Sequence, residues 1–197
     1  MDDVALADIL SAVGLAIALA ACAGLRAWLP LLMAGILSRA GILNLGAAFG
    51  FLSTNKALAL FALATAIEVV GDKIPAVDHA LDALSTVLRP AAGAMLAASV
   101  FGRITDPVES AALGLAVGAP VALIPHAGKT ALRAASSAFT AGLANPALSI
   151  AEDVATVALF LMAVLVPVAV GSALLVVAFL LVRRFLSRPR AGAAVTA

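Results

Sequence analysis

The chain has 197 residues, of which 64% are hydrophobic and only 12% are charged, and its mean hydropathy is +1.16. Soluble domains carry roughly 25% charged residues, so this composition excludes an ordinary water-soluble protein and indicates an integral membrane protein. The 12 basic and 11 acidic residues nearly cancel, which gives no electrostatic basis for binding nucleic acid.

The first long apolar region predicts a membrane span over residues 5–24, then a break, then a short helix over residues 28–40. Gly24, Arg26 and Pro30 interrupt an otherwise continuous apolar pattern. A helix needs about 20 apolar residues to cross the hydrocarbon layer, so the second helix is too short to span it alone. Short helices of this kind are tolerated where protein or a water-filled cavity surrounds them.

The next apolar stretch predicts a span over residues 56–71. Glu68 and Asp72 are four residues apart near its end, so they share one helix face. Residues 76–88 alternate apolar and charged positions at helical spacing, which predicts an amphipathic helix that lies in the membrane interface. The following segment, residues 90–102, starts at a proline and is too short to span the membrane alone.

Residues 107–124 predict a further span, with one proline near its start and another that bends its end. His126, Lys129 and Arg133 follow at helical spacing and form a basic stripe on one face. This stripe can point to the interface, where it would touch anionic lipid, or to the protein interior.

Residues 154–182 are all uncharged, and this run is longer than one span requires. It predicts one long kinked helix or two short ones, and we favour a tilted and kinked helix. Glu152 and Asp153 precede this run and complement the positive end of a helix. The tail, residues 183–197, contains four arginines and no acid, so the positive-inside rule predicts a cytoplasmic C-terminus.

The elements together predict an all-α fold: a polytopic transmembrane helical bundle with an interfacial amphipathic helix and short re-entrant or broken helices. We expect about five crossings in a single membrane domain over residues 1–197. Residues 25–40 and 132–147 match without gaps at several positions, including an arginine, and indicate an internal repeat. Duplicated halves are frequent in transporters, whose sites lie at the repeat interface.

Charged residues near the ends of the apolar segments form the candidate site. An ionised side chain inside a membrane costs roughly 2.5–3.5 kcal/mol or more, so such groups usually face protein or water and pair with one another. We therefore expect them to converge on one buried site that binds a small ion or anionic solute. The candidate residues are Arg26, Glu68, Asp72, Lys73, Lys129, Arg133, Glu152 and Asp153.

Two alternatives stay open for these charges. Long basic side chains at segment ends can extend to the lipid headgroups, and we favour this interpretation for Lys73, Arg89 and Arg103. In a second class of function, His126, Lys129 and Arg133 would hold a lipid phosphate during lipid flipping. In a third class, the charges would only lock the helices of a structural or assembly subunit together.

The sequence contains no arrangement typical of an enzyme, a cofactor site or a metal site. No nucleophile with its base, no phosphate-binding glycine loop and no metal-ligand spacing occurs. The one cysteine, Cys22, follows Leu19-Ala20-Ala21 as in a lipoprotein signal, but the acidic N-terminus lacks the basic region of a signal peptide. We expect Cys22 to be a buried thiol in a membrane helix.

Four blocks of the sequence resemble a family of bacterial membrane proteins known as domain of unknown function 4126. They are GLRAWLPLL (24–32), the long block that begins EVVGDKIP (68–99), GKTALRAA (128–135) and NPALSIAEDV (145–154). The resemblance covers nearly the whole chain and implies a small polytopic membrane protein. We therefore expect a multi-pass protein of the bacterial inner membrane, with lipids and a small solute as partners. The sequence leaves open whether it forms a homo-oligomer.

Overall fold

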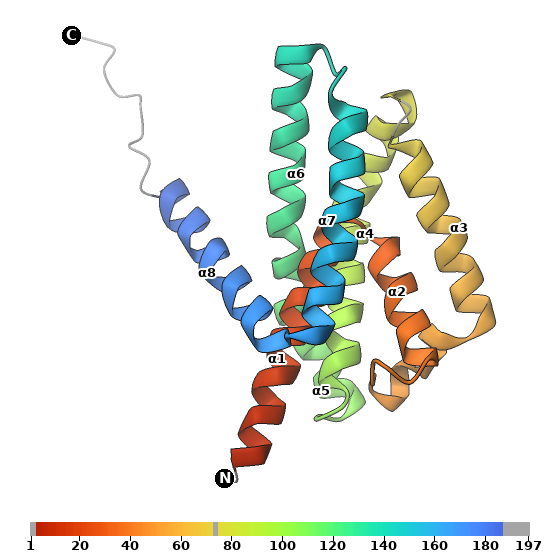
Figure 1. Ribbon diagram of the computed structural model, residues 1–197, viewed down its shortest axis with the longest axis vertical. Coiled ribbons are helices and arrows are strands. Elements are labelled where there is room, and N and C mark those ends of the chain that lie inside the picture. Colours follow the sequence, from red (N-terminus) through yellow and green to blue (C-terminus); the bar gives the residue numbers. More distant parts are fainter. Residues whose placement is uncertain (1–2, 73–74, 187–197) are drawn as a thin grey trace.

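The structure is a computed structural model that describes residues 3–72 and 75–186. All regular structure in these residues is helical, and the helices pack into an elongated bundle (Figure 1). Four helices are long and apolar enough to cross a membrane, or five if the bent pair Ala47–Ser53 and Asn55–Gly71 counts as one span. The predicted all-α bundle is therefore confirmed, and four or five candidate spans agree with the expected number of about five.

Helix α1 (Asp3–Leu25) is the central element, because it contacts α4 (Pro75–Phe101), α6 (Ala119–Thr140), α7 (Asn145–Leu165) and α8 (Pro167–Leu186). Its buried face consists largely of alanines, whose small side chains let neighbouring helices approach closely. Cys22 is fully buried in this helix, as expected from the sequence.

The predicted break after α1 is present, and the chain turns back along α2 (Trp28–Arg39). Figure 1 shows the break at mid-height of the bundle, with α2 running toward the end at which α1 begins. The short helix η1 (Ala47–Ser53) then leads into α3 (Asn55–Gly71), which is bent by 61° relative to η1. The α1–α2 hairpin thus places two helix ends inside the bundle.

Helix α4 corrects the predicted division at Pro90. We predicted an interfacial helix over 76–88 and a separate short segment over 90–102, but one helix runs from Pro75 to Phe101 with Pro90 inside it. The small residues after this proline hold the helix in place by close packing. A Cβ atom at Gly93 would lie 2.7 Å from the Gly118 carbonyl oxygen. The side chains of residues 73–83, which carry the predicted amphipathic pattern, lie outside the described part of the chain.

The span predicted over 107–124 is longer than expected. Helix α5 (Pro107–Leu113), the π-helical turn η2 (Gly114–Gly118) and α6 follow one another as a single apolar run of 34 residues. Asp106 caps its start by accepting hydrogen bonds from the backbone N–H groups of Val108 (2.8 Å) and Glu109 (3.0 Å). This run carries the basic stripe into the bundle.

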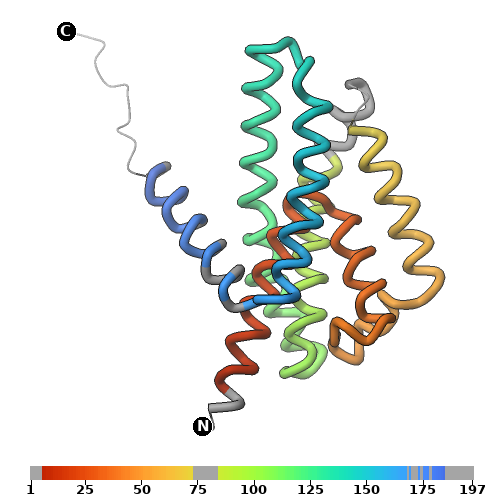
Figure 2. Tube along the Cα trace, viewed as in Figure 1, coloured from red at the N-terminus to blue at the C-terminus, as the bar shows by residue number. Residues whose placement is uncertain are grey.

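The single kinked helix predicted over 154–182 is wrong. Two helices, α7 and α8, meet at Val166, whose backbone (φ −138°, ψ 65°) is not helical. Pro167 explains the break, since a proline disfavours a helical conformation at the residue before it and supplies no N–H group. Helix α8 turns away from the direction of α7 at this break (Figure 2) and packs against α1. Because α7 begins at Asn145, Glu152 and Asp153 lie two turns inside it rather than at its start.

The two matched segments of the predicted internal repeat have different helix boundaries. In residues 25–40 the arginine follows the end of a helix, whereas in residues 132–147 it lies inside α6, and the helix ends only after Thr140. Alanine-rich segments produce such matches by chance, so local similarity did not imply equal structure.

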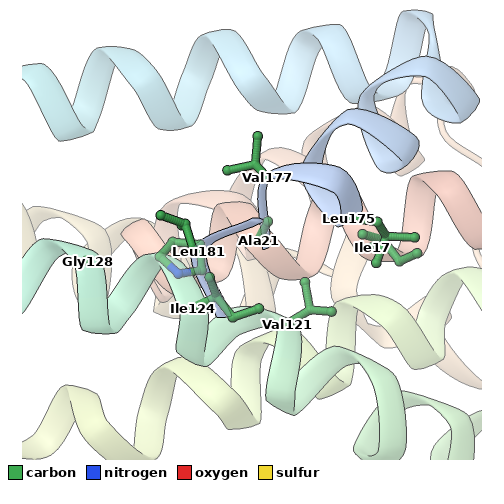
Figure 3. A pocket seen from close by; sticks show the side chains of 9 residues that line it. Ile17, Ala21, Val121, Ile124, Gly128, Leu175, Val177 and Leu181 are labelled. Atoms are coloured by element: carbon green, nitrogen blue, oxygen red, sulfur yellow. The ribbon is translucent and has the colours of Figure 1, made fainter. Parts of the chain in front are cut away.

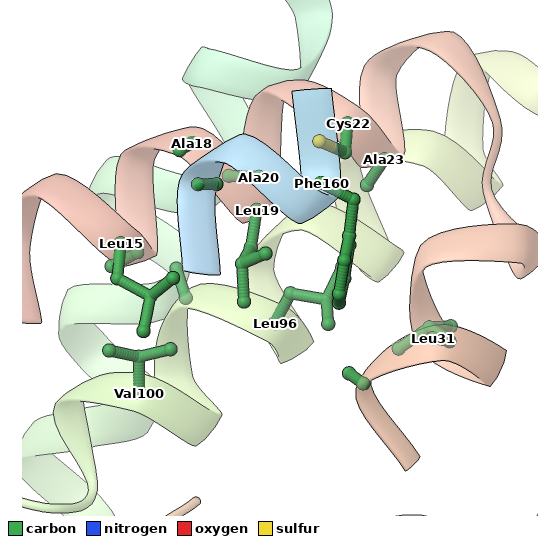
Figure 4. Packing of buried hydrophobic residues seen from close by; sticks show 14 of the residues in the cluster. Leu15, Ala18, Leu19, Ala20, Cys22, Ala23, Leu31, Leu96, Val100 and Phe160 are labelled. Carbon is green, nitrogen blue, oxygen red and sulfur yellow. The ribbon is translucent and has the colours of Figure 1, made fainter. Parts of the chain in front are cut away.

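The apolar core fills the half of the bundle in which α1 begins. Leu19 of α1, Leu96 and Val100 of α4 and Phe160 of α7 point toward one another (Figure 4). All four side chains are fully buried. This packing leaves the charged residues to the other half of the bundle.

Candidate functional site

The structure brings the charged residues together between α1, α3, α4, α6 and α7. Of the eight candidates predicted from the sequence, seven meet in one buried network, which we call the charged centre: Arg26, Glu68, Asp72, Lys129, Arg133, Glu152 and Asp153. The eighth, Lys73, lies outside the described residues.

Arg26 lies at the break between α1 and α2, and its side chain is completely buried. Its guanidinium donates a hydrogen bond to Asp72, and further bonds to the carbonyl oxygen (3.1 Å) and the hydroxyl oxygen (2.9 Å) of Ser149. Its Nε atom lies 2.7 Å from Oδ1 of Asp153. Arg26 therefore joins the broken helix to the end of α3 and to α7.

Lys129 and Arg133 point into the bundle from one face of α6. The Nζ atom of Lys129 lies 3.1 Å from Oδ2 of Asp72 and 3.0 Å from Oε2 of Glu152. Nη2 of Arg133 lies 3.0 Å and 3.4 Å from the same two oxygen atoms. Three cationic side chains thus converge on a single oxygen of Asp72, and two of them, Lys129 and Arg133, also lie within 3.4 Å of Glu152.

Glu68 and Arg89 stabilise the two helix ends at the break. The Glu68 carboxylate accepts hydrogen bonds from the backbone N–H groups of Ala27 (3.0 Å) and Trp28 (3.2 Å), at the positive end of α2. Arg89 contacts the Gly24 carbonyl oxygen (3.4 Å) at the negative end of α1. These contacts satisfy backbone groups that would otherwise be unpaired inside the bundle.

The expected position of Arg89 is wrong, because its side chain is 1% exposed rather than extended to the headgroups. It lies 3.9 Å from Oε1 of Glu68 and 2.9 Å from Nδ1 of His126. Both partners are distant in sequence, so no local signal distinguished Arg89 from Arg103, which is exposed as expected. Ser149 was also missed, although it lies three residues before Glu152 on the same face of α7.

The basic stripe points to the protein interior, which is one of its two predicted orientations. His126, Lys129 and Arg133 are all buried, so this stripe does not form an outer surface for lipid headgroups. The charged centre together with Arg89 places four acids (Glu68, Asp72, Glu152 and Asp153) against four bases (Arg26, Arg89, Lys129 and Arg133). Pairing of this kind offsets the cost of burying each charge.

Exposure rises from one side of the charged centre to the other. The side chains of Arg26 and Asp72 are 0% and 2% exposed, whereas those of Glu152 and Asp153 are 9% and 24% exposed. The network is therefore most open at its α7 side.

Two cavities lie near this network. One, of about 170 Å³, is bounded by Glu68, Trp28, Ser85 and apolar side chains of α3 and α4. The other, of about 260 Å³, lies between α1, α6 and α8 and is lined by apolar residues such as Ile17, Val121 and Leu175 (Figure 3). The second cavity suits a hydrocarbon chain and offers an ion no polar partner.

Within the described residues, no group of three or more histidine, cysteine or acidic side chains is arranged to hold a metal ion. A family model described as "Domain of unknown function (DUF4126)" matches residues 13–187. No curated protein and no solved structure matches the chain.

Proposed function

Since the chain belongs to the DUF4126 family of uncharacterised proteins and is a multi-pass membrane protein, we propose a function from its charged centre: it moves a small ion or an anionic solute across the membrane. We further propose the bacterial inner membrane as its location, with the C-terminus in the cytoplasm, because the arginine-rich tail follows the positive-inside rule.

One observation carries this proposal: Arg26, Lys129 and Arg133 converge on Asp72 beside a broken helix inside an apolar bundle. Ionised groups inside a membrane are costly, and they typically mark the pathways of ions and substrates. Broken helices with their ends in the membrane interior are likewise typical of transporter binding sites.

The distribution of polar and apolar residues supports the same function. Toward the connection between α6 and α7, the face of α6 continues from Arg133 to the buried Ser136 and then to Thr140. In the opposite direction the apolar core around Leu96 and Phe160 closes the bundle. Such an arrangement is expected of a carrier that opens to one side at a time, with its site beyond a closed apolar barrier.

The lipid-phosphate alternative has less support from the geometry. Lys129 and Arg133 are only 4% and 5% exposed, and both are held by interior acids rather than directed at the bundle surface. A structural subunit would also contain buried ion pairs, so that alternative is addressed by experiment.

The test is a flux assay with purified protein in liposomes, recording charge movement and solute uptake for a panel of small cations and anions. We expect at least one ion to produce a protein-dependent flux that Lys129→Gln abolishes. Lys129→Arg, which keeps the charge, should retain part of it. The matched control is Lys56→Gln, because Lys56 is an exposed lysine outside the charged centre.

Thermal unfolding in detergent separates loss of function from loss of fold in each variant. If no ion in the panel moves faster than in empty liposomes, the transport proposal is wrong. If Lys129→Gln lowers only the thermal stability and leaves the flux unchanged, the charged centre has a structural role alone.

A further inference from the structure

We infer that the charged centre takes a small monovalent oxyanion together with a proton, with Glu152 as the proton acceptor and Lys129 and Arg133 as the anion-binding groups. This inference rests on the proposed transport function and specifies its substrate class and coupling. Three observations support it: the contacts of Lys129 and Arg133 with Asp72 and Glu152, the exposed fraction of the Glu152 side chain, and the charges that surround Glu152.

The two cations of α6 are already occupied by carboxylates. Lys129 Nζ and Arg133 Nη2 each contact both Asp72 and Glu152. An external anion can bind them only if one of these carboxylates loses its charge or withdraws. The competition is between ligands of the same chemistry, because a carboxylate and an oxyanion both present oxygen acceptors to a guanidinium and an ammonium group.

Glu152 is the carboxylate that can be exchanged. Asp72 receives three cations at one oxygen and its side chain is 2% exposed. The Glu152 side chain is 9% exposed, and its contact with Arg133 is longer, at 3.4 Å, than the 3.0 Å contact of Asp72 with the same nitrogen. Lys129 lies almost equally near the two carboxylates, at 3.0 Å from Glu152 and 3.1 Å from Asp72. Arg26, however, donates a hydrogen bond to Asp72 and lies 4.0 Å from Glu152. Protonation of Glu152 therefore gives up less attraction to the cations than protonation of Asp72 would.

The charges around Glu152 explain why an anion would bind together with a proton. Arg26 (4.0 Å), Lys129 and Arg133 face it from the α1–α2 break and from α6, while Asp72 of α3 and Asp153 of α7 lie against the same cations. A bound anion would add a negative charge to three acids in a buried site. Protonation of Glu152 removes one negative charge, so the site with anion and proton carries the same net charge as before.

The proton balance is simple. A proton from the solution binds an oxygen of Glu152, and the anion takes the place of that charge beside Lys129 and Arg133. On the other side of the membrane, the anion and the proton both return to solution. No covalent bond of the anion changes. The planar guanidinium of Arg133 favours anions with two oxygen atoms on one side, such as a carboxylate or a phosphodiester.

The experiment measures anion binding and proton uptake on the same detergent-solubilised protein. Nitrate, formate and dimethyl phosphate serve as probes, because all three are monovalent and ionised near neutral pH. Titration calorimetry in buffers of different ionisation enthalpy gives the affinity and the number of protons taken up. We expect uptake of about one proton per bound anion, and affinity that falls about tenfold per pH unit once Glu152 is ionised.

The Glu152→Gln variant resembles the protonated state. We expect it to bind the probe anion with no proton uptake and without pH dependence, whereas Glu109→Gln, at an exposed acid, should behave as the wild type. The pH dependence of the wild type tests the coupling independently, should the variant fail to fold.

The outcomes separate the two proposals. Binding without proton uptake in the wild type, or unchanged proton uptake in Glu152→Gln, would overturn the coupling and leave anion transport standing. If none of the three probes binds while the flux assay shows transport of a cation, the inference that the site binds an anion is wrong and the proposed transport function remains. If neither assay detects an ion, both proposals fail.

Discussion

Replacing Asp72 with asparagine tests whether the charged centre holds the bundle together. Asp72 follows the last residue of α3, and its carboxylate pairs with Arg26, Lys129 and Arg133. Asparagine keeps the size of the side chain and one oxygen acceptor, so the change removes a charge and little packing. Three buried cations would then share the remaining acids.

The magnitude follows from the cost of leaving buried charges uncompensated. Removing one partner of a buried ion pair destabilises a protein by about 3–5 kcal/mol. The Asp72 side chain is 2% exposed, so water screens these pairs little and the full range applies. For a chain of this length, that loss corresponds to a fall in melting temperature of about 6–20 °C.

The assay is thermal unfolding of the purified protein in one detergent, followed by circular dichroism, with Glu109→Gln as the matched exposed control. Removing Arg133 as well should recover part of the loss, because the double variant Asp72→Asn, Arg133→Gln deletes both signs of charge. A double-mutant cycle should give a coupling of about 1–3 kcal/mol. A fall no larger than that of the control, with no coupling, would refute the reasoning.

Three further predictions concern packing, capping and access. Gly118→Ala should lower the free energy of unfolding by about 1–3 kcal/mol, because the new Cβ would lie 2.4 Å from a carbonyl oxygen of α4. Gly128→Ala, in the same helical run, places its Cβ in open space and should instead raise the free energy of unfolding by about 0.5–1 kcal/mol. Asp106→Ala should remove the N-cap of α5 and cost about 1 kcal/mol, measured by the same unfolding assay. Cys22, fully buried, should react with a maleimide only after denaturation, and labelling of the native protein within minutes would contradict its placement.

The helices that the sequence predicted best are those with local signals at their ends. Gly24, Arg26 and Pro30 indicated the break after α1, and the structure confirms it. The spacing of Glu68 and Asp72, and that of Lys129 and Arg133, correctly placed each pair on one helix face, because helical periodicity needs no knowledge of neighbours.

The helix boundaries at prolines were predicted poorly, because a proline can either end a helix or lie inside a continuous one. Pro90 stays inside α4, where close packing of Gly93 against η2 holds the helix together. Pro167 separates α7 from α8. Which outcome occurs depends on contacts made by the neighbouring turns, and these contacts come from residues distant in sequence.

The pairing within the charged centre could not be predicted for the same reason. Which acid meets which base depends on how closely the helices approach, and that approach is controlled by small residues. A Cβ at Gly24 would lie 2.2 Å from the Ala122 carbonyl oxygen, so α1 and α6 touch at the backbone. This contact brings Lys129 within reach of the α1–α2 break. Composition predicts tight packing in general but not the partner of a given helix.

The network contains two sets of charges with different tasks. Glu68 and Arg89 bind the backbone ends of α2 and α1, and a helix break inside an apolar bundle would leave these backbone groups unpaired without them. Lys129 and Arg133 bind side-chain carboxylates, for which an external anion can substitute. The break therefore depends on the first set and the proposed transport on the second. A change at Glu68 should then lower stability in the absence of any solute, whereas a change at Lys129 should alter the response of stability to added anion.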